Sequence, residues 1–211
     1  MKKLLLIGDS IRAGYDVQVR DALAGQAEVF FPKENCRFAE YVLRSLFDWK
    51  SGLGLETVDV VHWNAGLWDT LYVYGKEEGP LTPIEVYDQF IRRIFRAIAH
   101  EFPGARQIFA ASTPVQEALY TGQWKRYNAD IRRYNEVARA AAADYGAEYN
   151  DLYAVVAAAP TSYYSDMTHL YTPEGTEMMT NAVLRAVCPT LGLETPEHVR
   201  TVSGDVEVVG M

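Results

Sequence analysis

Five short apolar runs alternate with longer segments in which apolar residues recur at helical spacing, and this alternation constrains the fold more than any other feature. The runs span residues 3–7, 27–31, 58–63, 107–111 and 147–150. They are continuous or nearly so, as in strands that are buried on both faces of a parallel sheet. Strands that alternate with helices predict a doubly wound α/β sheet.

The expected helices lie between and after these runs, at residues 37–49, 83–102, 125–145 and 172–187. The second begins within Thr82-Pro83-Ile84-Glu85, which has the pattern of a capping box with proline at the first helical position. The last begins at Thr172-Pro173 and is expected to end before Pro189. Together the elements predict a three-layer α/β/α sandwich with a five-stranded parallel, flavodoxin-like sheet.

The chain of 211 residues is expected to form one main domain, residues 1–188, followed by an extension at 189–211. In the extension, "HVRTVSGDVEVVG" alternates with a period of two around Ser203-Gly204-Asp205, which predicts a β-hairpin. We interpret it either as a small appendage to the sheet or as a contact in a homo-oligomer.

The charge and hydropathy of the chain limit the partners that it can bind and the cellular compartment that we expect for it. The net charge of −8 argues against a nucleic acid or an anionic membrane as partner, and no apolar stretch approaches the roughly 20 residues of a membrane helix. Lys2-Lys3 followed by residues 4–7 begins like a secretion signal, but this apolar run is shorter than the roughly 7–15 residues required. The two cysteines, Cys36 and Cys188, form no CxxC motif. We therefore expect a cytoplasmic protein with reduced thiols.

Polar residues with catalytic potential follow three of the expected strands or precede the last helix. Ser10 comes just after the first strand, Asn64 after the third, and Asp166 and His169 before the last helix. Each alone has an ordinary structural explanation: a helix cap, a turn and a surface ion pair. Because ligands bind at the carboxyl ends of strands in such sheets, all four residues are expected at one edge. There they would supply nucleophile, oxyanion donor, base and orienting carboxylate.

The blocks "IGDSI", "NAGLWD" and "DMTHL" resemble, in order and spacing over about residues 1–188, the signature blocks of the SGNH/GDSL hydrolases. The resemblance implies an ester hydrolase without a metal or organic cofactor, with Ser10 as nucleophile and Asp166 and His169 completing the triad. It also implies an oxyanion hole formed by the Ser10 N–H, the Asn64 amide and one N–H of the second block.

Two departures from that family concern the second and third blocks. The second block normally contains a glycine, but residues 34–39 here have none. We expect Cys36 or Arg37 to supply the backbone donor, since any non-proline residue carries an N–H. The third block usually reads Gly-x-Asn-Asp, whereas Trp63 precedes Asn64 and Ala65 follows it. This pattern is nearer to a divergent branch than to the lipases of the family.

The segment after Asn64, "LWDTLYVYGKEEGPLTP", is long and rich in aromatic residues. Trp68 and Tyr72 are predicted to line the substrate site, although ordinary loop packing explains them almost as well. The predicted substrate is a small ester of a short acyl group on a polar carrier, such as an acetylated sugar. Asp9 is expected to cap the turn, and His62 is expected to be a core histidine.

Two other functions compete with this prediction. One is a non-catalytic module that binds a glycan or another small ligand on the same scaffold, because fold does not determine function. The other is a flavodoxin-like cofactor-binding protein, which needs a phosphate-binding loop. The sequence has no GxxxxGK[ST] motif, and it also lacks the GxSxG elbow of the α/β-hydrolases.

Overall fold

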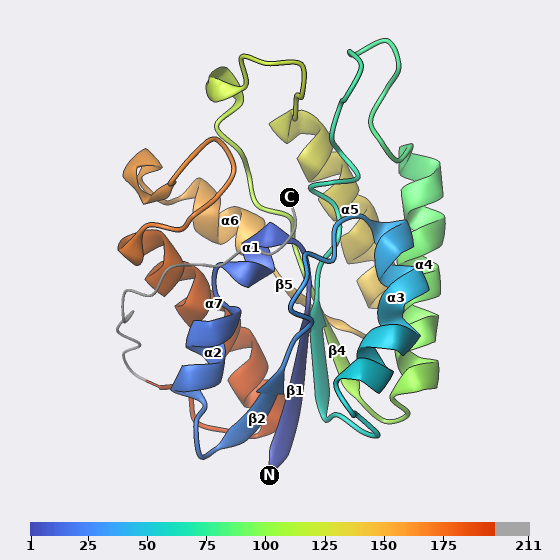
Figure 1. Ribbon diagram of the computed structural model, residues 1–211, viewed down its shortest axis with the longest axis vertical. Helices are drawn as coiled ribbons and strands as arrows, with labels where there is room; N and C mark the ends of the chain where they lie inside the picture. Colours follow the sequence, from blue (N-terminus) through green and yellow to red (C-terminus); the bar gives the residue numbers. More distant parts are fainter. Residues whose placement is uncertain (197–211) are drawn as a thin grey trace.

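The computed structural model describes residues 1–196 and contains one five-stranded sheet (Figure 1). The strands are β1 (Lys2–Ile7), β2 (Ala27–Phe30), β3 (Val60–Trp63), β4 (Arg106–Ala110) and β5 (Glu148–Asn150). Their order is β2-β1-β3-β4-β5, and every neighbouring pair is parallel. The predicted doubly wound parallel sheet is confirmed.

Helices cover both faces of the sheet and complete the predicted three-layer sandwich. They are α1 (Ser10–Ala13), α2 (Asp16–Ala22), α3 (Ala39–Gly52), α4 (Ile84–Glu101), α5 (Asn128–Asp144), α6 (Leu152–Ala157) and α7 (Pro173–Leu191). Two short 3₁₀ turns are η1 (Glu117–Leu119) and η2 (Thr161–Tyr163). In Figure 1, α3, α4 and α5 lie on one side of the sheet, and α2, α6 and α7 lie on the other.

Each face of the sheet has its own apolar core, because successive side chains of a strand point to opposite faces. In β1, Leu4 and Leu6 join the core beneath α2 and α7, whereas Leu5 and Ile7 join the core beneath α3, α4 and α5. All four residues are completely buried. This double burial accounts for the uninterrupted apolar run at the start of the chain.

Two sequence predictions about helix ends were wrong. The residue that caps α4 is Pro83, which forms no side-chain cap bond, because the Thr82 hydroxyl bonds to the Asp69 carboxylate instead. Helix α7 does begin with Thr172 as its cap, but it continues through Pro189 to Leu191. Proline removes only one helix N–H. The buried side chains of Cys188 and Leu191 hold the last turn against the core, and Gly192 ends it in a left-handed conformation.

Two long loops rise above the carboxyl edge of the sheet, at the top of Figure 1: residues 64–83 between β3 and α4, and residues 111–127 between β4 and α5. They are joined by an antiparallel bridge in which Tyr72 and Lys125 exchange backbone hydrogen bonds of 2.9 and 3.0 Å. The two loops therefore form one connected structure at the end of the sheet where a ligand is expected.

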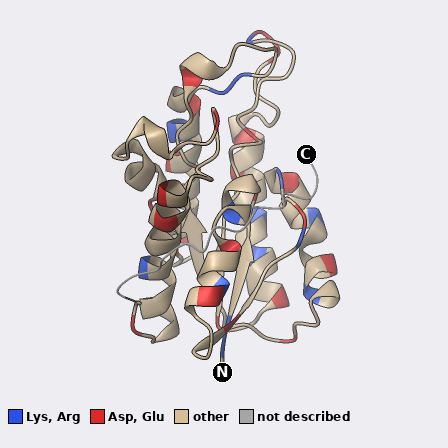
Figure 2. Cartoon of the chain, turned by 60° about the vertical axis from the view of Figure 1, so that its left-hand side comes forward, with Lys and Arg blue, Asp and Glu red and all other residues tan. Residues whose placement is uncertain are grey.

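The predicted hairpin around Ser203 lies outside the described residues. Within residues 1–196, none of the helices combines the length and the apolar character that crossing a membrane requires. Lys and Arg residues are interspersed with Asp and Glu over the helices in the view of Figure 2. Both cysteines are buried and unpaired, as predicted for reduced thiols.

Candidate active site

Ser10 stands directly beyond the carboxyl end of β1, where Gly8 and Asp9 turn the chain into α1. The Asp9 carboxylate accepts the backbone N–H of Ile11 at 3.0 Å and so caps this short helix, as predicted. The Ser10 side chain is therefore not needed as the cap. Its Oγ lies 2.8 Å from Nε2 of His169, a residue 159 positions away in the sequence.

His169 is oriented by Asp166, and the two residues occupy one tight turn before α7. His169 Nδ1 lies 2.7 Å from Asp166 Oδ2, while Asp166 Oδ1 accepts the backbone N–H groups of Thr168 at 2.6 Å and His169 at 2.8 Å. Partial burial opposes ionisation of Asp166, but these hydrogen bonds outweigh it and lower its pKa. An ionised Asp166 accepts a hydrogen bond from Nδ1–H, and this tautomer leaves the unprotonated Nε2 free to accept the Ser10 hydroxyl proton.

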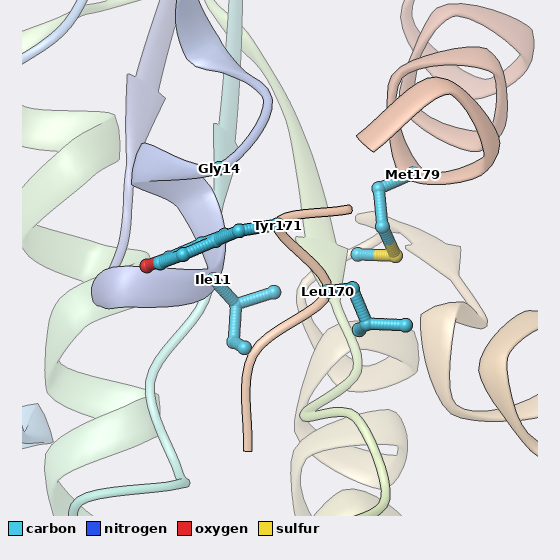
Figure 3. Close-up of a pocket in the computed structure, with 5 residues that line it drawn as sticks. All are labelled: Ile11, Gly14, Leu170, Tyr171 and Met179. Carbon is cyan, nitrogen blue, oxygen red and sulfur yellow. The ribbon is translucent and has the colours of Figure 1, made fainter. Parts of the chain in front are cut away.

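Tyr171 is a site residue that the sequence analysis missed. Its ring stacks on that of His169, with centroids 4.7 Å apart and planes at 24°, and its hydroxyl donates to the Ser10 carbonyl at 2.6 Å. Figure 3 shows Tyr171 beside the turn that carries Ile11 and Gly14. A Cβ atom on Gly14 would lie 2.7 Å from the Tyr171 ring, so glycine permits this approach. Only the proximity of Tyr171 to His169 in the sequence could have suggested it.

Asn64 follows β3 and approaches the turn after β1. Its backbone N–H donates to the Ile7 carbonyl at 3.0 Å, and its side-chain Oδ1 is buried without a hydrogen-bond partner among the described residues. A Cβ atom on Gly8 would lie only 1.9 Å from this oxygen, so the close approach requires glycine at position 8. The Asn64 amide bonds to the Asp9 carboxylate, and its side chain forms no bond to the backbone of its own turn in the described structure, which argues against a turn-capping role.

The turn at residues 34–39, the second block, does not offer the backbone donors that we predicted for the oxyanion hole. The Cys36 N–H donates to the Gly8 carbonyl at 3.1 Å, and the Arg37 N–H donates to Asn35 Oδ1 at 2.9 Å. Both predicted donors are therefore occupied. The N–H of the next residue, Phe38, has no acceptor within residues 1–196. The error arose because these two bonds depend on how the turn folds against β1, which the residue types alone do not reveal.

Arg37 occupies the conformation that favours glycine. Its φ of 52° is positive, and no other non-glycine residue of the described structure has a positive φ. The turn is fixed to β1 by Arg12, which is almost fully buried, pairs with Asp16, and donates to the carbonyls of Glu34 at 2.6 Å and Gly8 at 3.4 Å. These bonds hold the turn in place without a glycine in the second block.

Asp69 joins this turn to the loop that carries Asn64. Both of its carboxylate oxygens lie 3.2 Å from the backbone nitrogen of Ala39, and the Thr82 hydroxyl also bonds to it. Asp69 is completely buried, and desolvation raises its pKa to about 7 in spite of these hydrogen bonds.

We expect Asp69→Asn to change the pH dependence of stability. Between about pH 4 and pH 7, the folded parent retains a proton that the unfolded chain has released, so its free energy of unfolding falls as pH rises. Asparagine does not titrate. The stability of Asp69→Asn relative to the parent should therefore rise by up to about 1.4 kcal/mol per pH unit through this window and level off above it. Urea unfolding at several pH values measures the difference; an offset that is the same at every pH would contradict the assignment.

Of the two aromatic residues predicted to line the site, the structure corrects Tyr72 and leaves Trp68 as a prediction. Tyr72 is 6% exposed, packs edge-on against Tyr127, and donates its hydroxyl to Asp130 at 2.9 Å. It therefore braces the two loops, which corrects the prediction that it offers a face to substrate. Trp68 is partly exposed and remains a candidate for that role. His62 is a core residue, as predicted: it is completely buried in β3, and its Nε2 lies 3.1 Å from Asn150 Nδ2.

Comparison with known proteins places this fold among the GDSL lipases and acylhydrolases. No protein-family model matches the chain, and no curated protein matches its sequence. A lipase/acylhydrolase from Enterococcus faecalis is similar in structure, with a TM-score of 0.70 and 18% identity over 93% of this chain and 100% of that one. A member of the lipolytic G-D-S-L family from Veillonella parvula has a TM-score of 0.66 and 16% identity over 88% of this chain and 97% of that one.

A third similar structure is a catalytic mutant of an acetylxylan esterase from Geobacillus stearothermophilus, with a TM-score of 0.68 and 14% identity over 92% of this chain and 95% of that one. The expected resemblance to the SGNH/GDSL hydrolases is thus confirmed at the level of the fold. At these identities the reaction has to be inferred from the site itself.

Proposed function

We propose that this protein is a serine ester hydrolase that removes short acyl groups, such as acetyl, from a polar or carbohydrate carrier. The observation that carries the proposal is the chain of hydrogen bonds from Ser10 Oγ through His169 to Asp166, with contacts of 2.8 and 2.7 Å. Three residues from two distant segments supply nucleophile, base and orienting carboxylate within hydrogen-bond reach.

In the proposed reaction, His169 Nε2 takes the hydroxyl proton as Ser10 Oγ attacks the ester carbonyl. The resulting imidazolium is stabilised by Asp166 and then gives its proton to the leaving alcohol. His169 next removes a proton from water, which attacks the acyl group on Ser10. The collapse of that second intermediate returns the proton to Ser10 and releases the acid.

Three donors in this proposal hold the negative oxygen of the tetrahedral intermediates: the Ser10 N–H, the Phe38 N–H and the Asn64 amide. The Ser10 N–H belongs to the first residue of α1 and has no acceptor within that helix. The Phe38 N–H has no acceptor among the described residues either. Donors that are already oriented before reaction stabilise developing charge without reorganisation.

The carrier is proposed to be polar because the loops above the sheet present aromatic side chains that also carry polar atoms. Trp68 is partly exposed, and Trp124 and Tyr74 are well exposed on the two loops. Such rings suit the faces of sugars as well as acyl groups. The fold shared with an acetylxylan esterase is consistent with this proposal.

The proposal is tested with a fluorophosphonate probe followed by peptide mapping. We expect covalent labelling at Ser10 in the parent and none in Ser10→Ala, because only a serine activated by a neighbouring base attacks the probe at a useful rate. Hydrolysis of p-nitrophenyl esters of increasing acyl length and of acetylated sugars then gives the preferred acyl group and carrier. An unlabelled parent that binds glycans would favour the alternative of a non-catalytic binding module.

A further inference from the structure

Arg126 bridges the two segments that bring Asn64 and His169 into the site. Its Nε donates to the carbonyl of Leu67, three residues beyond Asn64, at 2.5 Å. Its Nη1 donates at 3.0 Å to the Tyr120 hydroxyl, whose oxygen lies 2.5 Å from Thr168 Oγ1. Thr168 immediately precedes His169 and donates its N–H to Asp166. The guanidinium therefore lies at the edge of the proposed active site.

The charge of Arg126 is not neutralised by an ion pair. No carboxylate of residues 1–196 lies within ion-pair distance of it, and its Nη2 group donates to none of those residues. Its positive charge acts on the Asp9 carboxylate, next to Ser10 in the sequence. Burial raises the pKa of Asp9, and the attraction to Arg126 lowers it in part. Because this partly buried guanidinium is held by two neutral oxygens, its outer N–H groups are available to a ligand.

We propose that Arg126 binds a carboxylate on the substrate, so that the preferred ester is an anionic one. This inference rests on the proposed function and narrows its substrate class from polar esters to esters that carry a carboxylate. A planar guanidinium held at two of its nitrogens presents the remaining N–H groups in a fixed direction, which suits two-point binding of a carboxylate.

The test compares pairs of esters that differ in one carboxylate. One pair is p-nitrophenyl butyrate and the p-nitrophenyl half-ester of succinic acid, which places the charge on the acyl part. The other is acetylated glucose and acetylated glucuronic acid, which places it on the carrier. We expect the parent to favour the anionic member of one pair. The preference is the kcat/KM for the anionic ester divided by the kcat/KM for the neutral ester of that pair. This ratio should fall about 10- to 100-fold in Arg126→Met.

Two further variants distinguish binding of a substrate carboxylate by Arg126 from a purely structural role of Arg126 in holding the loops together. Tyr120→Phe removes the hydroxyl between Arg126 and Thr168 but keeps the positive charge, so it should preserve the ratio even where it lowers both rates. Arg126→Lys keeps the charge without the planar fork and should retain part of the preference. If Arg126→Met lowers kcat/KM equally for the charged and neutral esters, or if the parent has no preference, Arg126 is only a brace and the inference is wrong.

Failure of the proposed function gives a different result. A parent that hydrolyses neither member of either pair and is not labelled at Ser10 is not a serine esterase. Calorimetric titration with monomethyl succinate then tests whether Arg126 binds a carboxylate, independently of any esterase activity. Binding by the parent that weakens in Arg126→Met would support the carboxylate site, and equal binding or none in both proteins would overturn it.

Discussion

Ser10→Ala and His169→Ala are each expected to lower kcat for a short-acyl ester by about 10⁴-fold or more. Ser10→Ala removes the atom that forms the acyl-enzyme, and His169→Ala removes the base that lies 2.8 Å from it. Because the two side chains act in the same step, the double variant should be little slower than either single variant. Initial rates at saturating substrate, measured with high enzyme concentrations, give all three values.

Exposed residues of the same types provide matched controls. Ser51 lies in the last turn of α3, and the side chain of His100, in α4, is 84% exposed. Ser51→Ala and His100→Ala should retain parental activity. Losses that multiply in the Ser10/His169 double variant would mean that the two residues act in separate steps, and a Ser10→Ala protein as fast as the parent would place the nucleophile elsewhere.

The fold was predictable because the signals that specify it are repeated along the chain. The five apolar runs and the helices between them reflect burial on both faces of one sheet, and each expected strand lies within one or two residues of its observed position. The proximity of Ser10, Asp166 and His169 was predictable for a related reason. The carboxyl ends of parallel strands meet at one edge, so polar residues that follow those strands meet there too.

The donors and braces of the site were less predictable, because they depend on the conformation of loops. Nothing in the residue types distinguishes the occupied N–H groups of Cys36 and Arg37 from the N–H of Phe38. Tyr72 could equally have lined the site, but its bond to Asp130 joins the loop at residues 64–83 to helix α5, which is separate in the sequence. Arg126 acquires its place only when residues 64–83 and 111–127 come together.

We expect Asn64→Ala to lower kcat by about 10²–10³-fold while KM changes little. If the Asn64 amide donates to the oxyanion, the contact strengthens as negative charge develops in the transition state, so its loss affects the chemical step rather than binding. Asn64 Oδ1 is buried without a partner, so alanine removes one unsatisfied acceptor together with the amide hydrogen bond to the Asp9 carboxylate. Because these two effects oppose each other, the melting temperature of Asn64→Ala should stay close to that of the parent.

Asn135 provides the matched control for this prediction. It is also a buried asparagine, but its amide accepts the backbone N–H of Ser112 and donates to the carbonyl of the same residue, both at 2.9 Å. Asn135→Ala should lose about 1–3 kcal/mol of stability, because it leaves two buried backbone groups unpaired. It should retain most of kcat, because the Asn135 amide bonds to Ser112 and to no member of the proposed triad or oxyanion hole. The two variants should thus show opposite patterns in kcat and melting temperature. A destabilised but fully active Asn64→Ala would remove Asn64 from the oxyanion hole and leave the Ser10 and Phe38 N–H groups as its donors.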